Sequence, residues 1–476
     1  MRKFGTLLVA ILSAMGLGTG PAMGVGDGEH GGQLVRVSGP TPFTPGCDGQ
    51  EPVGTLYPNA EVQPHLAVDP TDPRHLVGVW QQDRWSGVGA RGLVTAISFD
   101  GGAHWTRTTP AVSTCTGGEY WRATDSQVSI APDGTAYVVS LSMNTAVAEG
   151  DHAILVSRSR DGGRRWERPT TLVREGTDPS RFVFNDLPSV TADPTDSRYV
   201  YVTWDRIVFP PLGGPLTLTR STDRGATWQP ARPIVDPGPN SVVAGPKIVV
   251  RPDGSLVAFF AVTVYDEETQ APLGLSFQVA RSMDKGRTWS APTKVADVEA
   301  AGTTEPVSGR TVRDGSAFAG QIAAAPDGRL HAVWQDSRFA DGARDGIALS
   351  SSSDGGRTWS TPTRVNPSAG AQAFSPAIAV TRDGTIGVSY STLAGGSTAT
   401  NWIARSSDRG RTWTAHRLTG PFDLAVAPVV ASPPDSLYLG DYHGMAAVGR
   451  HFVTLFPMTT RDPANRTDIF VSSTLG

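Results

Sequence analysis

The stretch SSSDGGRTW, residues 351–359, contains the pattern S-x-D-x-G-x-x-W, and the same pattern occurs five more times in the chain. The other copies read SFDGGAHW (98–105), SRDGGRRW (159–166), STDRGATW (221–228), SMDKGRTW (282–289) and SSDRGRTW (406–413). Successive tryptophans of the six copies are 61, 62, 61, 70 and 54 residues apart. A loop that recurs at a nearly constant spacing indicates a repeat architecture, in which each repeat is one supersecondary unit.

The segments around each copy predict what this unit is. Two apolar stretches joined by a turn, and then a third, come before each copy, and a short fourth stretch follows its tryptophan, as in SAPTKV at 290–295. Turn sequences such as DPTD and APDG join antiparallel strands, and the 54 glycines and 37 prolines suit many such turns. We therefore predict an all-β chain, a β-propeller built from four-stranded antiparallel blades.

The two ends of the chain decide the predicted number of blades. Residues 437–473 contain a seventh set of three strands without the repeated loop, and QLVRVSGP at 33–40 can supply the missing fourth strand. Closing the ring with this N-terminal strand hides both sheet edges, which favours seven blades. A ring of six blades, with 437–473 belonging to an existing blade, is the alternative.

The first 24 residues have the features of an export signal. Arg2 and Lys3 precede an apolar stretch at about residues 4–17, and small residues near 22–24 suit a signal peptidase. We expect residues 1–24 to be removed and residues 25–476 to form a single propeller domain, secreted to the extracellular medium as a monomer. The apolar stretch is short for a membrane span, and a net charge of −4 with mixed signs offers no basic stripe, so we expect neither membrane nor nucleic acid as a partner.

The two cysteines, Cys47 and Cys115, are predicted to form a disulfide. An exported chain folds in an oxidising compartment, which favours this pairing over two free buried thiols. In the predicted ring, Cys47 lies just before the first blade and Cys115 lies between the first and second blades, on the same face. A bridge there would stabilise the fold by about 4 kcal/mol in the chain-entropy model.

The six repeated loops are interpreted as structural. Each Asp carboxylate can accept backbone N–H groups of its own hairpin, the Ser hydroxyl can join that network, and the Gly tolerates a positive φ. The Trp can bury its ring between strands or sheets. The loops join third and fourth strands, so they lie on the face opposite the connections between blades. This role is assigned to Asp100, Asp161, Asp223, Asp284, Asp354 and Asp408.

The repeated pattern resembles the Asp-box of the sialidase-like β-propellers, also called bacterial neuraminidase (BNR) repeats, and the resemblance extends over residues 60–476. The resemblance implies a secreted glycoside hydrolase of the exo-α-sialidase type, acting on terminal acidic sugars of glycans. The histidines show no zinc-ligand spacing, and we expect neither a metal nor a cofactor. Asp-boxes also occur in propellers that only bind, so the alternative is a non-catalytic propeller that binds glycans or proteins.

We expect the site on the face of the blade connections, where first strands start and second strands end. The predicted first-strand starts supply Asn59, Glu61, Gln63, Arg122, Asp125, Asn185, Asp186, Gln321, Ser375, Asp441, Tyr442 and His443. The second-strand ends supply Asp83, Arg84, Asp205, Arg206, Tyr265, Glu268, Asp336, Arg338, Arg461 and Asp462.

The resemblance also implies roles for some of these residues: three arginines that bind the substrate carboxylate, a tyrosine nucleophile and an aspartic acid/base. Arginine suits a carboxylate because its planar guanidinium offers two parallel donors. Tyr442 is the best-placed tyrosine, and the loop after the third arginine contains Asp341 and Asp345. The arginines best placed for the cluster are Arg84, Arg206 and Arg338.

The chain departs from the family pattern in two places. The arginine expected at the first strand has no counterpart in NAEVQPHLAV (59–68), and WSGVGARG (85–92) contains no carboxylate. The recurring Asp-Arg pairs can instead tie the rims of the blades together. The insertion at 299–315 either arches over the axis, bringing Glu305, Arg310 and Arg313 inward, or lies as a surface loop.

Overall fold

The computed structural model of the chain describes residues 34–49, 54–144, 150–178, 180–315, 318–367, 370–431 and 435–474. The predicted export signal and Gln33, the first residue of the predicted N-terminal strand, lie outside these ranges. Strands dominate the described residues, which contain three short 3₁₀ helices: η1 (Thr114–Thr116), η2 (Arg338–Ala340) and η3 (Leu424–Val426). The all-β prediction is confirmed. None of the described helices is long and apolar enough to cross a membrane.

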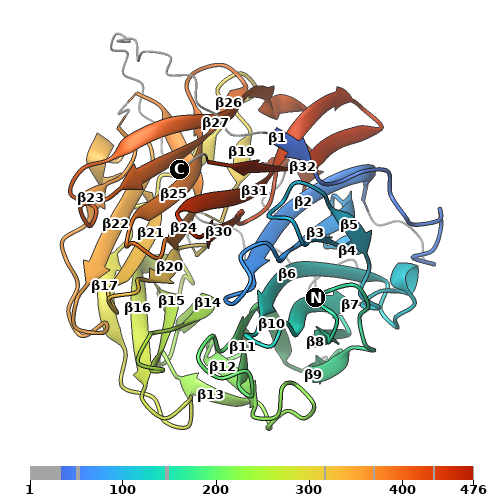
Figure 1. The fold of residues 1–476 in the computed structure, drawn as a ribbon, viewed down its shortest axis with the longest axis horizontal. Helices are drawn as coiled ribbons and strands as arrows, with labels where there is room; N and C mark the ends of the chain where they lie inside the picture. Colours follow the sequence, from blue (N-terminus) through green and yellow to red (C-terminus); the bar gives the residue numbers. More distant parts are fainter. Residues whose placement is uncertain are drawn as a thin grey trace.

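Antiparallel sheets of four strands follow one another along the chain and surround a common centre (Figure 1). One sheet comprises β10 (Phe182–Ala192), β11 (Val200–Phe209), β12 (Leu216–Ser221) and β13 (Arg232–Val235). The next comprises β14 (Ser241–Val250), β15 (Leu256–Tyr265), β16 (Pro272–Ser282) and β17 (Thr293–Asp297). Two more contain β20 (Gln321–Ala324), β21 (Leu330–Asp336), β22 (Gly346–Ser352) and β23 (Thr363–Arg364), and then β24 (Gln372–Val380), β25 (Ile386–Leu393), β26 (Thr398–Ser406) and β27 (Thr414–Asp423).

The first two repeats are joined into one sheet of eight strands, because Ala90 pairs with Ala123. Its first half contains β2 (Leu56–Val68), β3 (Leu76–Trp85), β4 (Ala90–Ser98) and β5 (Thr106–Thr108). Its second half contains β6 (Arg122–Ile130), β7 (Ala136–Met143), β8 (His152–Ser159) and β9 (Thr170–Glu175).

The two ends of the chain meet in one sheet. The sheet contains β30 (Gly444–Val448), β31 (His451–Asp462), β32 (Asn465–Ser473) and, paired with β32, the N-terminal β1 (Leu34–Arg36). The predicted pairing of the N-terminal strand with the last repeat is therefore confirmed. The innermost strands β2, β6, β10, β14, β20, β24 and β30 contact one another in this order, and β30 contacts β2 again.

The start of this closing sheet differs from the prediction. Its first strand begins at Gly444, whereas the prediction began at residue 437. Instead β29 (Ser436–Tyr438) joins a small separate sheet with β28 (Val429–Val430), β19 (Thr311–Arg313) and β18 (Thr303–Thr304). The parallel pairing of β19 with β29 is a long-range contact with the insertion, which no local pattern encodes.

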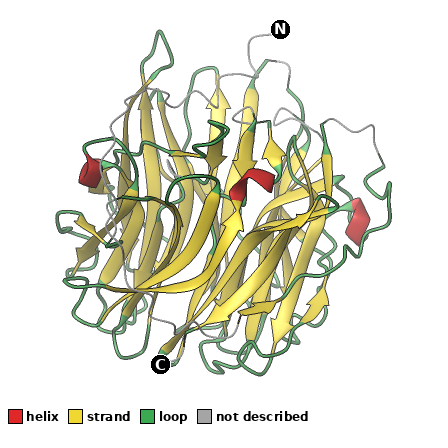
Figure 2. Ribbon diagram, turned by 90° about the horizontal axis from the view of Figure 1, so that it is seen from above, coloured by secondary structure: helices red, strands yellow, loops and turns green. Residues whose placement is uncertain are grey.

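The apolar core lies between neighbouring sheets. Second strands such as β11 (VYVTWDRIVF) are rich in β-branched and aromatic residues, which favours strands buried on both faces. Trp204 of β11 belongs to the same buried cluster as Val139 of β7. At the closure, Leu455 of β31 packs in one cluster with Trp80 of β3. Seen from the side, the strands run between two faces on which the loops gather (Figure 2).

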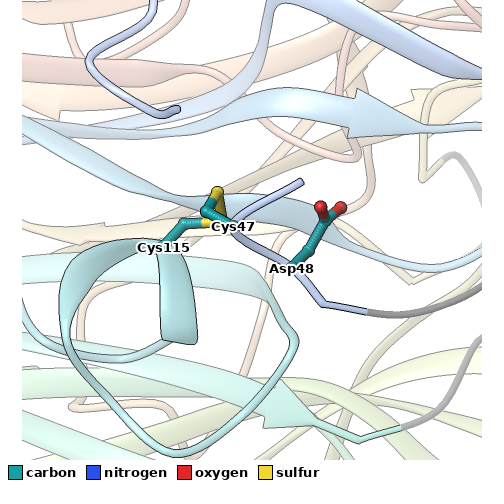
Figure 3. A group of neighbouring side chains, drawn as sticks. All are labelled: Cys47, Asp48 and Cys115. Carbon is teal, nitrogen blue, oxygen red and sulfur yellow. A yellow bond between two sulfur atoms is a disulfide. The ribbon is translucent and has the colours of Figure 1, made fainter. Parts of the chain in front are cut away.

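The disulfide prediction is confirmed: Cys47 and Cys115 are bonded, with their Cα atoms 4.9 Å apart (Figure 3). The bridge ties the segment after β1 to η1, between the first and second repeats. Asp48 lies beside the bridge, but both sulfur atoms are used by the disulfide and are not free to bind a metal. The Asp48 carboxylate instead accepts the indole N–H of Trp85 at 3.0 Å and lies 3.4 Å from the guanidinium of Arg91.

The Asp-box hairpins have the predicted internal hydrogen bonds. The hydroxyl of Ser352 donates to Asp354 at 2.8 Å, the N–H of Gly356 donates to the Ser352 hydroxyl at 2.8 Å, and the N–H of Thr358 donates to Asp354 at 3.0 Å. Gly356 has a φ of 86°, which favours glycine. The same three hydrogen bonds recur in the other five loops.

Candidate functional site

The innermost strands carry β-bulges at similar positions around the axis. At each bulge the register with the second strand shifts, and one residue has a positive φ: Gln63 (56°), Asp125 (49°), Leu187 (45°), Gly245 (57°) and Ser375 (51°). Residues other than glycine rarely adopt this backbone conformation. Bulges of this kind often redirect side chains near functional sites. At three of the bulges this residue is a buried polar one: Gln63, Asp125 and Ser375.

A set of polar residues, which we call the central cluster, meets at this point: Gln63, Gln81, Arg84, Asp125, Arg313, Tyr438 and Asp441. Its strongest contact is an ion pair, in which the Nε and Nη2 of Arg313 donate to the two carboxylate oxygens of Asp441 at 3.1 Å each. The Asp441 side chain is fully buried, whereas 29% of the Arg313 side chain is exposed. Arg313 therefore carries positive charge from the buried cluster to the surface.

Tyr438 lies between two guanidinium groups. The guanidinium carbons of Arg84 and Arg313 lie 4.9 and 5.4 Å from the centre of its ring, within the range of cation–π attraction. Its hydroxyl donates to Oε1 of Gln63 at 2.9 Å and lies 3.5 Å from Oδ2 of Asp441. A phenol with a carboxylate and two cations beside it has both an acceptor for its proton and positive charge to stabilise a phenolate.

Two glutamines link the rest of the cluster. Nε2 of Gln63 donates to Asp125 at 2.8 Å, and Oε1 of Gln63 also accepts from the amide of Gln81. Nη1 of Arg84 donates to Oε1 of Gln81 at 3.3 Å. Through these amides, residues of β2, β3, β6 and β29 are held in one network around the axis.

Burial sets the protonation of the cluster. Burial raises the pKa of Asp125, and the nearby charge of Asp441 raises it further, whereas the amide of Gln63 and the two arginines oppose the increase. Burial and Asp441 also raise the pKa of Tyr438, again against the two arginines. Burial lowers the pKa of Arg313, but Asp441 reverses this effect, so that its net pKa lies well above the usual value. The phenol is neutral and Arg313 is charged at pH 7.

Two more carboxyl groups extend the cluster along β10 and β11. Asp186 and Asp205 lie directly opposite each other in the register of these strands. Burial and the charge of Asp125 raise the pKa of Asp186 to about 8, and burial and Asp186 raise the pKa of Asp205 well above its usual value. The centre of this face thus contains a pair of carboxyl groups whose pKa values burial raises far above the usual range.

The structure joins only one of the three predicted arginines to the central cluster. Arg84 contacts Tyr438, as described above. Arg206 donates to Glu175 and Asn185, and Arg338 makes two hydrogen bonds with Asp336, at 2.6 and 2.8 Å. Arg338 therefore forms the Asp-Arg pair of the alternative interpretation, whereas the carboxylate bonded to Arg206 is Glu175 of β9. Arg313, from the insertion, contributes the second guanidinium of the cluster.

The other predicted catalytic residues lie in different surroundings. Tyr442 precedes β30, is 4% exposed and donates its hydroxyl to the backbone oxygen of Ser126 at 2.9 Å. Asp345 is buried and accepts the N–H groups of Ala301 and Gly302, at 2.8 and 3.0 Å. It therefore anchors the start of the insertion, and burial raises its pKa to about 7.

Asp341 ends η2 on an exposed loop. Of the inward residues suggested for the insertion, Arg313 reaches the centre. Glu305 is buried against the N–H groups of its own turn, at Val307 and Ser308, and Arg310 is exposed.

Tyr438 belongs to the central cluster but was not among the site residues predicted from the sequence. It lies on β29, whose parallel partner β19 is more than 120 residues earlier in the chain. The sequence offers one signal, since Leu437 and Tyr438 stand four and three residues before Asp441, in a stretch that the repeat pattern assigns to a strand. The insertion that supplies β19 has no repeat pattern of its own, so its pairing could not be read from the residues.

Comparisons with known proteins agree with the repeat pattern. A protein-family model described as a BNR repeat-like domain matches residues 315–440. The resemblance to sialidase-like BNR-repeat proteins is thereby confirmed. No curated protein sequence matches the chain.

Several solved structures resemble the chain at low identity. A protein of unknown function from Dyadobacter fermentans is 17% identical with a TM-score of 0.48, covering 74% of this chain and 96% of its own. A Hadza microbial sialidase is 17% identical with a TM-score of 0.49, covering 85% and 75%. An α-L-arabinofuranosidase of Fusarium graminearum is 12% identical with a TM-score of 0.47, covering 94% and 98%. At these values the similarities carry no argument about activity.

Proposed function

We propose that this BNR-repeat protein is a secreted glycoside hydrolase with seven blades, and that it acts on terminal acidic sugars of glycans at the central cluster. The observation that carries the proposal is the position of Tyr438, between two guanidinium groups and with its hydroxyl 3.5 Å from a carboxylate oxygen. A neutral phenol can approach an anionic sugar without the charge repulsion that a carboxylate nucleophile would meet, and tyrosine nucleophiles are known in glycosidases.

In this proposal Arg313 recognises the acidic group of the sugar. It is partly exposed, charged and bonded to Asp441, so its guanidinium is held in place before the substrate arrives. A fixed guanidinium binds a carboxylate through paired hydrogen bonds and loses little freedom in doing so. Arg84, behind the Tyr438 ring, adds positive charge that favours both the anionic substrate and a developing phenolate.

Tyr438 replaces Tyr442 as the proposed nucleophile. The Tyr442 hydroxyl is already bonded to a backbone oxygen, which cannot take up a proton at neutral pH. The Tyr438 hydroxyl donates to Gln63 but also lies 3.5 Å from Oδ2 of Asp441, to which the proton can transfer as the oxygen attacks the anomeric carbon. Comparing Phe substitutions at these two positions therefore tests the assignment, because each removes one buried hydroxyl and keeps the ring.

The experiment measures release of 4-methylumbelliferone from its sialic acid, glucuronic acid and arabinofuranose conjugates by the purified protein. We expect turnover of an acidic conjugate, a loss of at least about 100-fold in Tyr438→Phe, and less than about tenfold in Tyr442→Phe. Full activity in Tyr438→Phe would reject the nucleophile. Preference for the neutral arabinofuranose conjugate would reject the acidic substrate.

The second candidate function is a non-catalytic propeller that binds glycans or proteins. The burial of Tyr438 and Asp441, which are 1% and 0% exposed, favours it, because a nucleophile must reach its substrate. Under this alternative the folded wild-type protein turns over none of the three conjugates but retains acidic glycans on an array. Arg313→Met then abolishes that binding.

A further inference from the structure

Two carboxyl groups beside the central cluster form a cross-strand pair. Asp186 of β10 and Asp205 of β11 are directly opposite in the antiparallel register, so both side chains lie on the same face of the sheet. Directly opposite residues have Cβ atoms about 5 Å apart, and like charges in such a pair are destabilising. The register alone therefore disfavours the state in which both groups are ionised.

The surroundings of the two groups differ. Asp205 is 1% exposed, and its Oδ1 has no hydrogen-bond partner among the described residues. An ionised oxygen without a donor would be costly at that depth, and a proton on Oδ1 would remove this cost. Asp186 is only partly buried, and its carboxylate accepts the N–H of Leu187 at 2.9 Å. The bulge at Leu187 follows Asp186 directly and bends the strand at this point.

The charged groups around the pair do not make ionisation of both carboxyl groups favourable. Asp125 of β6 and Asp441, which precedes β30, add negative charge, while Arg313 of β19 is bonded to Asp441 through two hydrogen bonds. Asp205 raises the pKa of Lys247 of β14, whose ammonium donates to the backbone oxygen of Gly245 at 3.3 Å. Burial lowers the pKa of Lys247 to about 8, so this lysine does not force Asp205 to ionise.

We infer that Asp205 stays protonated and donates a hydrogen bond to Asp186, and that Asp186 is the proton donor of the central cluster. The first half concerns the carboxyl pair alone, and the second half rests on the proposed glycosidase function. Asp186 is the more exposed member, and its strand β10 packs against β6, which carries Asp125 of the central cluster. Asp205 has a positioning role, because it acts on the substrate only through Asp186.

Asp186 transfers its proton to the glycosidic oxygen while the bond from that oxygen to the anomeric carbon breaks, and the electron pair of the bond stays on the leaving oxygen. The Tyr438 oxygen bonds to the anomeric carbon and its proton passes to Asp441. The leaving group departs as an alcohol, and Asp186 becomes a carboxylate that accepts the O–H of Asp205. A water oxygen then bonds to the anomeric carbon as the bond to Tyr438 breaks, the water proton returns to Asp186, and the proton on Asp441 returns to the Tyr438 oxygen. The sum is one glycoside and one water converted into a sugar and an alcohol.

The carboxyl pair can be tested without any substrate. In protein labelled with ¹³C-aspartate, the infrared C=O band of protonated carboxyl groups is recorded across pH 5 to 9 for wild type, Asp205→Asn and Asp336→Asn. We expect a band that persists at pH 9 in wild type and in Asp336→Asn, whose carboxylate is bonded to Arg338, but is lost in Asp205→Asn. A wild-type protein with no protonated aspartate at pH 9, or an unchanged band in Asp205→Asn, overturns the inference.

The role in turnover has a separate readout. Asp205→Asn keeps a neutral donor beside Asp186 and should retain activity within about tenfold, with an unmoved alkaline limb of the pH profile. Asp205→Leu removes the donor, destabilises ionised Asp186 and should shift that limb upward by at least about one pH unit. A limb that does not move in Asp205→Leu overturns Asp186 as the donor. If wild type has no activity but the infrared band behaves as expected, the carboxyl pair stands and the proposed function fails.

Discussion

The aspartates of the Asp-box loops and those at the centre of the opposite face are in contrasting states. Asp223 accepts hydrogen bonds from the Ser221 hydroxyl, from the Thr227 hydroxyl and from backbone N–H groups of its own hairpin, and these donors lower its pKa to about 2 although slight burial acts against them. Asp186 accepts the N–H of Leu187 among carboxyl neighbours, and burial raises its pKa to about 8. One residue type therefore has opposite charge states at neutral pH on the two faces.

The difference follows from where the donors come from. An Asp-box supplies its own donors within eight residues, so its carboxylate is satisfied as soon as the hairpin forms and has no capacity left for a substrate. The central carboxyls are brought together from different strands by the closure of the ring, and the fold supplies them with few donors. Carboxyl groups with few hydrogen-bond donors and strongly shifted pKa values are typical of catalytic sites. The proposed function accordingly places the chemistry at the central cluster and gives the Asp-box face a structural role.

The largest expected effect comes from breaking the central ion pair. Arg313→Met leaves Asp441 buried without its partner, and we expect a loss of about 3 kcal/mol in unfolding free energy and at least about 100-fold in turnover of an acidic glycoside. The matched control is Arg338→Met, which breaks the pair with Asp336 outside the central cluster. Urea denaturation and initial rates of both variants check the prediction. An equal loss of turnover in both would contradict a special role of Arg313.

The carboxyl groups of the two faces should change the free energy of unfolding in opposite directions as the pH rises. The raised pKa of Asp186 means that its contribution is present below the unfolded value near 4 and is lost as the pH rises toward 8. Asp205 adds to this loss, so we expect unfolding free energy to fall by up to about 1.4 kcal/mol per pH unit for each group, and Asp205→Asn to reduce the slope.

The Asp-box aspartates should affect the free energy of unfolding at acidic pH. Their lowered pKa values give stability that is present above pH 4 and is lost as the pH falls toward 2, as for Asp223 and Asp284. Urea denaturation from pH 3 to 9 measures both slopes. Asp223→Asn should flatten only the acid side, and an effect of Asp205→Asn on the acid side alone would contradict the contrast.

A smaller effect is expected from one Asp-box. Asp161→Ala removes the acceptor for the Ser159 hydroxyl and for the N–H of Arg165, and should lower the unfolding free energy by about 1 kcal/mol. Turnover of the folded fraction should be unchanged, because the loop lies on the face opposite the central cluster. Thermal unfolding and rates at a temperature well below the transition separate the two quantities. A specific loss of activity would show that the Asp-box face takes part in function.

The smallest effect is expected at Asp341, a candidate acid/base from the sequence. The residue ends η2 on an exposed loop, so Asp341→Asn should change the unfolding free energy by less than about 0.5 kcal/mol and leave turnover unchanged. The same rate assay and denaturation experiment measure both. Loss of activity in this variant would restore the catalytic position predicted from the loop after Arg338.

Features encoded locally were predictable. The Asp-boxes repeat the same serine, aspartate and glycine within eight residues, and the cysteines stand in equivalent connections, so both could be assigned before the fold was known. The pairing of β1 with β32 followed from the need to close a sheet edge. Asp125, Asp186, Asp205 and Asp441 were recognised as inward residues because they start or end strands.

The central contacts depend on long-range packing and could not be assigned in this way. Arg313 reaches Asp441 only because the insertion pairs β19 in parallel with β29, which also places Tyr438 at the centre. Arg206 and Arg338 share the Asp-Arg pattern with Arg84, but neighbouring groups from their own parts of the ring bind them. A repeated pattern predicts equivalent positions, whereas the site depends on where the repeats differ.

The measurement that tests the account most directly compares Tyr438→Phe with Asp161→Ala in one assay of acidic glycoside hydrolysis, with the folded fraction of each protein determined in parallel. The account predicts that Asp161→Ala retains the wild-type rate per folded molecule, while Tyr438→Phe falls by at least about 100-fold. A wild-type rate in Tyr438→Phe, together with a loss in Asp161→Ala, would place the chemistry on the Asp-box face and contradict the account.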